Sequence, residues 1–358
     1  MQGIVSSRQP FDKQRRSPVA FWRRMGYNQH MARRENWDMI GHHWAVQVLR
    51  GHISRGRIRH AYLITGPRGV GRRTLALRAA QALNCPQPIE AGIPCASCNT
   101  CRRIERQQHP DLLVVQAEEE TLKVEQIRSL QQKLALLPYE ARYKIALLLN
   151  FESANESAAN ALLKTLEEPP SRVILFLTAL DSEVLLPTIR SRCELIRLRP
   201  LPYTVVAEGL QTHATIPADE ANLLAHLSNG CPGLALHLHR QRQALEQRTH
   251  HLAALKEILQ QDRVTRFRLA EQLAANKSET REALLHWLSF WRDVLLVSSN
   301  AGEQVINLDE SDALQQLAKR VSAPQAARIT RNIQHTLLML EKNVNPRLAL
   351  EALLLQLP

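Results

Sequence analysis

The stretch AYLITGPRGVGRRT, residues 61–74, joins an apolar run to a glycine-rich turn and then to the start of an Ala/Leu/Arg-rich segment. The apolar run predicts a short buried strand, and residues 74–83 predict a helix. A glycine-rich turn between a strand and a helix is the setting in which backbone N–H groups at a helix start bind phosphate. The stretch therefore predicts a strand–loop–helix unit of an α/β domain.

The loop itself departs from the sequence that a phosphate-binding loop needs. Gly66 and Gly71 fit the glycines of the pattern G-x-x-x-x-G-K-[ST], but Arg72 and Arg73 stand at the Lys and Ser/Thr positions. The Lys normally reaches the β- and γ-phosphates, and the hydroxyl ligates Mg²⁺. Thr74 is one residue out of register, about 100° further around a helix. The candidate nucleotide-binding residues are Gly66, Gly69, Gly71, Arg72, Arg73 and Thr74. We expect a degenerate loop that does not support hydrolysis, although Arg72 could still pair with a phosphate.

Composition indicates a globular chain of 358 residues, long enough for two or three domains. Its hydrophobic content of 44% and charged content of 22% are typical of such proteins, and no apolar run approaches the length of a membrane span. The net charge of +12 is compatible with nucleic acid or an acidic partner. Solvated Arg-rich helices would give the same charge.

Residues 1–35 form a basic segment without a helical or strand period. We expect a disordered basic extension. Two alternatives remain: a gene start placed too early, with Met31 as the true start, or a transit peptide.

Four cysteines follow the loop's helix with the spacing C-x₉-C-x₂-C-x₂-C. They are Cys85, Cys95, Cys98 and Cys101. Four thiolates at this spacing predict a closed tetrahedral zinc site, and the absence of an open position predicts a structural metal. A disulfide pair and unpaired thiols are the alternatives, and neither a metal site nor free thiols would need an oxidising compartment.

Further apolar runs predict strands over 112–115, 144–150, 173–177 and 194–198. Helical patterns over 123–137 and 153–168 alternate with them. This alternation predicts a parallel sheet covered on both faces.

The strand 144–150 lacks the acids that an ATPase of this layout carries at its end. Such acids hold Mg²⁺ and polarise the attacking water, but this strand ends in Leu149 and Asn150. Glu152 is the first acid and lies beyond the strand.

Strand patterns stop near residue 200, and helical patterns continue to the end of the chain. The expected organisation is an extension over 1–35 and an α/β domain over 36–199, with a zinc module at 85–111. A small helical domain over 200–245 and a larger helical domain over 246–358 follow.

Four motifs, with the four-cysteine insert after the loop's helix, together resemble the clamp-loader branch of the AAA+ ATPases, and within it the delta-prime family of bacterial DNA polymerase III. The motifs are RHAYLITGPRGVG at 59–71, HPD at 109–111, AANALLKTLEEPP at 158–170 and TIRSRC at 188–193. The likeness is dense from about 37 to 200 and thin afterwards. It implies an AAA+ parallel-sheet domain with a zinc-binding insert, a helical lid and an all-α C-terminal collar.

The resemblance also implies residue roles. The Ser-Arg-Cys motif implies that Arg192 is an arginine finger acting in trans on a neighbour's ATP, the alternative being that Arg192 only caps the sheet end. The family's two sensor positions fall at Leu180 and Gly233 and are lost. The elements of an ATP site in this chain are thus degenerate, while the residue that would serve a neighbour is intact.

We therefore expect a non-hydrolysing clamp-loader subunit in a hetero-oligomer with gamma/tau and delta subunits. Through that complex it would act on the sliding clamp and primed DNA, as part of a polymerase holoenzyme in the bacterial cytoplasm at the replisome. Structural zinc is the expected cofactor, and we expect no membrane partner and no ATP binding by this chain. One alternative is a gamma/tau-like ATPase with a divergent loop. Another is a basic zinc-containing DNA-binding protein outside replication.

Overall fold

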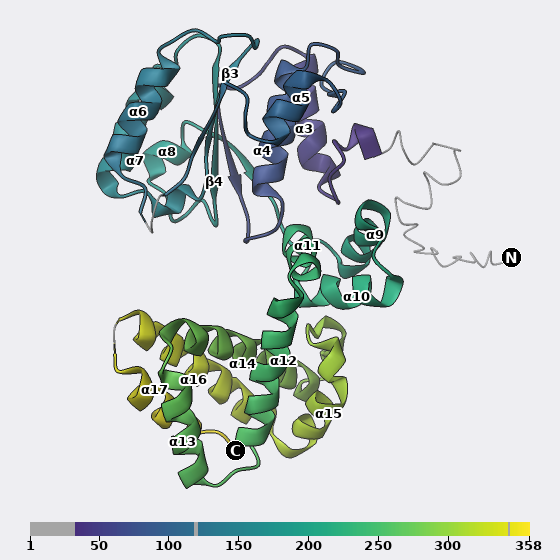
Figure 1. Ribbon diagram of the computed structural model, residues 1–358, viewed down its shortest axis with the longest axis vertical. Helices are drawn as coiled ribbons and strands as arrows, with labels where there is room; N and C mark the ends of the chain where they lie inside the picture. Colours follow the sequence, from purple (N-terminus) through teal and green to yellow (C-terminus); the bar gives the residue numbers. More distant parts are fainter. Residues whose placement is uncertain (1–32, 118–120, 343) are drawn as a thin grey trace, which may run out of the picture.

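Figure 1 shows the computed structural model, which describes residues 33–117, 121–342 and 344–358. An α/β part comes first, a group of short helices follows it, and a larger helical part ends the chain. The basic extension expected over 1–35 lies almost entirely outside the described residues.

The α/β part is built on a five-stranded sheet whose pairings are all parallel. Its strands are β1 Ala61–Thr65, β2 Leu112–Val115, β3 Lys144–Leu148, β4 Val173–Ala179 and β5 Glu194–Arg197. The order across the sheet is β2-β3-β4-β1-β5, which confirms the predicted parallel sheet. Every residue of β1, β3 and β4 is buried, which explains why these strands are nearly continuous apolar runs in the sequence.

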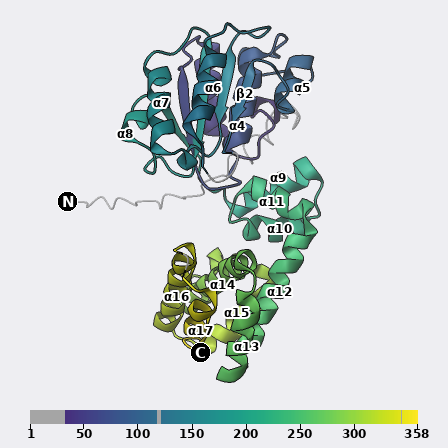
Figure 2. The ribbon, with the colours of Figure 1, turned by 60° about the vertical axis from the view of Figure 1, so that its left-hand side comes forward.

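Helices cover both faces of this sheet (Figures 1 and 2). They are α3 His43–Ser54, α4 Arg72–Asn84, α5 Asn99–Glu105, α6 Val124–Leu134, η1 Phe151–Ser153, α7 Glu156–Glu167 and α8 Pro187–Arg190. Successive strand residues point to opposite faces, so β1 contributes to two separate cores. Ile64 packs in one core with Leu75 of α4, whereas Leu63 packs in the other with Leu162 of α7.

One predicted helix is shorter in the structure. The pattern over 123–137 predicted a helix to Leu137, but α6 ends at residue 134. Lys144 Nζ donates hydrogen bonds to the carbonyl oxygens of Lys133 and Leu136 at 3.0 and 2.8 Å. A cation from the neighbouring strand thus satisfies carbonyls at the helix end, which favours ending the helix there.

The rest of the described chain is helical. Its elements are α9 Tyr203–Ala214, α10 Ala218–Leu227, α11 Pro232–Arg240, α12 Arg242–Ile258, α13 Arg263–Ala274, α14 Lys277–Ser298, η2 Gly302–Gln304, η3 Leu308–Glu310, α15 Ser311–Arg320, α16 Ala323–Glu341 and α17 Pro346–Leu354. Helices α9 to α11 share one small core. A larger core forms around Trp287, Phe290 and Trp291 of α14.

Helix α12 joins the two helical parts as one continuous rod (Figure 1). The boundary expected between residues 245 and 246 lies inside this helix. A second link is the hydrogen bond from His226 Nδ1 to the carbonyl oxygen of Val305, at 2.8 Å. Among the described helices, none has both the length and the apolar character needed to cross a membrane.

Candidate functional site

The glycine-rich loop connects the carboxyl end of β1 to the start of α4, as the sequence predicted. Gly71 is the N-cap of α4 with a φ of 113°, and no side chain caps the helix start. Gly66 has a φ of 145°, and a Cβ there would lie 2.3 Å from the carbonyl oxygen of Leu198. Both positions therefore require glycine for backbone reasons alone.

The start of α11 closes directly onto this loop. The backbone N–H of Gly233 donates a hydrogen bond to the carbonyl oxygen of Gly69 at 2.7 Å. A Cβ on Gly69 would lie 2.7 Å from the backbone nitrogen of Leu234, and a Cβ on Gly233 would lie 2.8 Å from the oxygen of Gly69. In the sequence, position 233 stood out only because it lacks the Arg of the family's sensor. In the structure, glycine at this position lets the start of α11 contact the backbone of the loop.

This contact predicts a stability effect. Gly233→Ala is expected to lower the free energy of unfolding by about 1–3 kcal/mol, because the added methyl group collides with a backbone oxygen that cannot rotate away. The urea midpoint of the full chain measures this. Gly51→Ala is the matched control, since Gly51 lies in α3 with nothing within 4 Å of an added Cβ, and alanine there should stabilise by about 0.5–1 kcal/mol. Equal effects of the two variants would contradict the close approach.

Arg72, at the position of the phosphate-binding Lys, is turned into the protein. Its side chain is buried and Nη2 donates to Asn150 Oδ1 at 3.3 Å. Asn150 follows β3 with a φ of 50°, and its backbone N–H donates to Thr178 Oγ1 on β4 at 2.9 Å. Burial lowers the pKa of Arg72, while nearby Glu152 raises it. Arg72 is thus bound to the residue at the end of β3 where an ATPase would carry an acid.

Two buried polar atoms beside this pair have no hydrogen-bond partner within the described chain. They are Arg72 Nη1 and Glu152 Oε2. The next two loop-end residues, Arg73 and Thr74, are exposed on the first turn of α4. The six candidate loop residues therefore divide into three glycines that shape the turn, one buried cation and two solvent-facing side chains.

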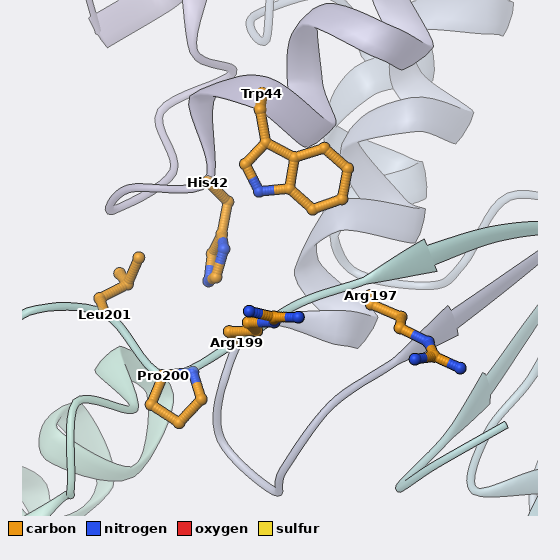
Figure 3. Close-up of a pocket in the computed structure, with 6 residues that line it drawn as sticks. All are labelled: His42, Trp44, Arg197, Arg199, Pro200 and Leu201. Atoms are coloured by element: carbon orange, nitrogen blue, oxygen red, sulfur yellow. The ribbon is translucent and has the colours of Figure 1, made fainter. Parts of the chain in front are cut away.

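A cavity of about 510 Å³ lies beside the loop (Figure 3). Its lining residues are His42, Trp44, Arg197, Arg199, Pro200 and Leu201. His42 Nε2 donates to the carbonyl oxygen of Val70 in the loop at 2.9 Å, and burial lowers the pKa of its imidazole. The lining contains cations and an aromatic ring but no carboxylate, so it offers no acidic ligand for Mg²⁺.

Arg192 lies at the other end of the sheet from the loop. It precedes β5 by two residues, and the register pairs Glu194 with Tyr62 and Arg197 with Thr65. Because β1 and β5 are parallel, the loop follows the end of β1 whereas Arg192 precedes the start of β5. The four residues of β5 alone span about 10 Å. The structure therefore separates Arg192 from the glycine-rich loop of its own chain.

The four cysteines lie together, as their spacing predicted. Their Sγ atoms are all within 4.8 Å of one another, and two of the separations are 3.5 and 4.0 Å. Tetrahedral zinc with Zn–S bonds of about 2.3 Å requires S–S separations of about 3.8 Å, so the donor set and its spacing fit a metal ion.

Backbone geometry prepares these sulfurs to be thiolates. The N–H groups of Cys95, Cys98 and Cys101 donate to the sulfurs of Cys85, Cys95 and Cys98 at 3.3–3.4 Å. Burial by itself would raise the pKa of Cys95, but the N–H donors of Cys98 and Ser97 lower that pKa to about 6. Burial raises the pKa of Cys101, which a bound cation would offset. These four residues could hold a metal ion.

The cysteine module is tied to the start of the described chain. Trp37 Nε1 donates to the carbonyl oxygen of Gly92 at 2.8 Å, and Gln81 Nε2 of α4 donates to the carbonyl oxygen of Cys101 at 2.8 Å. The sequence did not indicate either contact, because no local pattern links residues this far apart.

Comparisons with known proteins identify the family. Residues 41–202 match the family model described as DNA polymerase III, delta subunit, and residues 242–358 match DNA polymerase III, delta subunit, C terminal. The chain is 34% identical to DNA polymerase III subunit delta' of Pseudomonas aeruginosa, over 84% of this chain and 92% of that protein. It is 31% identical to subunit delta' of Escherichia coli, over 87% of this chain and 92% of that protein.

A shorter similarity links the chain to another subunit. It is 38% identical to DNA polymerase III subunit tau of Salmonella typhimurium over 49% of this chain, and the match spans only 27% of that protein. The similarity to delta', by contrast, extends over nearly the full length of both proteins. This chain therefore belongs to the delta-prime family of DNA polymerase III subunits.

Proposed function

We propose that this chain is a clamp-loader subunit that does not hydrolyse ATP and that completes a neighbouring subunit's ATP site with Arg192. The observation that carries the proposal is the placement of Arg192 at the end of the sheet opposite the chain's own loop. A guanidinium there cannot serve a nucleotide bound at residues 66–71 of the same chain, but it can serve one on an adjacent subunit.

Four features of the loop argue against ATP turnover by this chain. Arg72 is occupied by Asn150, and Thr74 faces solvent. No acid follows β3 directly. The backbone of Gly69 is closed against α11. Without a Mg²⁺ ligand and a lysine aimed at the phosphates, the charge that develops during phosphoryl transfer has no counterpart. The loop then serves as a structural turn that supports α11.

Arg192 has the chemistry that an arginine finger requires. Its side chain is 34% exposed, and guanidinium is a planar cation that can bind a phosphoryl group with two N–H donors. A finger supplied in trans stabilises the charge on the transferring phosphoryl group and is worth about 10³–10⁵ in turnover.

We further propose the partners and the domain roles. The chain assembles with gamma/tau and delta subunits, and through that complex acts on the sliding clamp and primed DNA in the bacterial cytoplasm. Residues 36–199 are the AAA+ module, residues 200–245 the lid, and residues 246–358 the share of a helical collar. Similarity to both delta' and tau chains supports assembly within one polymerase complex. The continuous helix α12 and the His226–Val305 contact suit a rigid subunit.

The cysteine module completes the proposal as a structural zinc site. Cys85, Cys95, Cys98 and Cys101 would hold the ion as four thiolates, which leaves no position for substrate. Zinc would supply no chemistry beyond joining the end of α4 to α5.

ATP assays on the purified chain test the central claim. We expect no Mg²⁺-dependent phosphate release by the chain alone, and stable co-purification with gamma/tau and delta subunits. Turnover by the chain alone would overturn the proposal and favour a gamma/tau-like ATPase with a divergent loop. Nucleotide binding without turnover would not, because the exposed Arg73 and the loop amides could still hold a phosphate.

A further inference from the structure

The side chain of Arg192 also contacts a residue outside the Ser-Arg-Cys motif, Glu167. Its Nη2 pairs with Glu167 Oε1 at 2.7 Å, while Nη1 donates to the carbonyl oxygen of Thr188 at 3.0 Å and to Ser191 Oγ at 3.3 Å. The last two partners belong to α8 and the turn after it, as Arg192 does. Glu167 alone comes from another helix, where it is the last residue of α7.

Helices α7 and α8 pack into the same core. Leu166, next to Glu167 in α7, and Ile189 in α8 are both fully buried in the same core. The backbone of Glu167 therefore has a defined position relative to the backbone of Arg192, and the carboxylate starts from a fixed point on α7. A close-packed core has low compressibility, so α7 and α8 can shift little relative to each other.

We propose that Glu167 is a positioning residue for Arg192, and this inference rests on the proposed function of Arg192 as a finger. Arginine has many rotamers, and ordering them when the subunits meet would cost conformational entropy. Contacts on both sides of the guanidinium restrict those rotamers before the subunits meet. Five N–H groups are available and three contacts use part of them, so donors remain for a phosphoryl group.

The ion pair with Glu167 can orient the guanidinium of Arg192 without preventing it from binding a phosphoryl group. The two side chains are 34% and 50% exposed, so water screens their attraction. A triphosphate carries more negative charge than one carboxylate and can compete for the guanidinium. The other arginine of the TIRSRC motif has a different partner, since Arg190 pairs with Glu183 in the turn before α8.

Chain neighbours of Glu167 provide a matched control. Glu168 is the adjacent carboxylate, is exposed, and makes no ion pair or side-chain hydrogen bond in the described chain. The change Glu168→Ala removes the same charge from the same place in the sequence. It should therefore report any general effect of charge at the end of α7.

The test is steady-state ATP turnover of the reconstituted loader, with Arg192→Ala defining the finger-dependent part. An exposed charge pair contributes about 1.4- to 5-fold in an equilibrium constant, so Glu167→Ala should remove about 30–80% of the finger-dependent turnover. KM for ATP should change much less than turnover, because a finger stabilises mainly the charge that develops on the transferring phosphoryl group and not the bound ATP. Glu167→Gln, which keeps an oxygen acceptor, should recover part of the loss, and Glu168→Ala should lose none.

The double variant separates positioning from a structural role. Glu167→Ala combined with Arg192→Ala should turn over no more slowly than Arg192→Ala alone, because Glu167 acts only through Arg192. A further loss in the double variant, or faster turnover in Glu167→Ala, would overturn the inference. If Arg192→Ala itself has no effect, the proposed finger fails; if only Glu167→Ala has none, the finger stands and this inference fails.

Discussion

Replacing Arg192 with alanine is expected to reduce turnover at the adjoining nucleotide site by about 10³-fold or more. The chain should stay folded, because the lost contacts are exposed and an exposed ion pair contributes only about 0.2–1 kcal/mol. The loader should also assemble, since one partly exposed side chain is a small part of any subunit interface. Total ATPase should fall by the share of that one site and of any sites coupled to it.

Arg190→Ala provides the comparison, because Arg190 is the last residue of α8 and Arg192 lies in the turn that follows it. Arg190 has similar exposure and pairs with Glu183, so its loss removes one charge and one ion pair just as the Arg192 change does. Phosphate release by the assembled loader should therefore fall for Arg192→Ala and not for Arg190→Ala. Full activity of Arg192→Ala in an assembled loader would refute the finger, and equal losses for both variants would indicate a general effect of charge.

The strands of the α/β part could be predicted because each leaves a local trace in the sequence. β1, β3 and β4 are buried on both faces, so they are short apolar runs that cannot be confused with surface segments. The cysteine cluster could be predicted for a similar reason. Three of its members lie within seven residues, and the fourth ends the helix that the loop begins.

The contacts that close the nucleotide loop could not be predicted in this way. Arg72 and Asn150 are 78 residues apart, and each appeared separately as a departure from a motif. Gly233 likewise appeared as a missing arginine, while its contact with Gly69 depends on how α11 approaches the loop. Sequence patterns report periodicity along one element, whereas these contacts depend on packing between elements.

Together these contacts change the interpretation of the loop. Two of the positions that depart from the family's ATP-site pattern contact each other in the structure, where Arg72 binds Asn150, and a third, Gly233, contacts Gly69 of the loop. Restoring one residue, for example Arg72→Lys, would therefore leave the other contacts in place and would also release Asn150. We infer that the loop acts in packing, where its glycines meet the needs of backbone geometry and Arg72 is an internal partner of Asn150.

Replacing Cys101 with serine is expected to remove the metal and destabilise the module at 85–111. Cys101 is fully buried in the cluster, and serine cannot supply the thiolate that a closed four-sulfur site needs. Structural zinc sites bind with apparent free energies of about 10–16 kcal/mol in zinc-finger peptides, so losing the ion should cost several kcal/mol here. Metal analysis of the purified protein should find about one zinc per chain in the parent and almost none in Cys101→Ser, and the variant should have the lower Tm.

The control for a lost buried thiol is Cys231→Ser, because Cys231 is also buried but lies outside the cluster. It should keep the zinc content of the parent.

Destabilisation of Cys101→Ser should reach beyond the cysteines, since Trp37 and Gln81 both donate hydrogen bonds to carbonyl oxygens of this module. Hydrogen exchange should then rise at the start of α3 and along α4 but not in α14, whose core is separate. A metal-free parent with the same Tm as Cys101→Ser would show instead that the four thiols pack without an ion. In that case the N–H donors to sulfur, rather than the cation, would hold the cluster together.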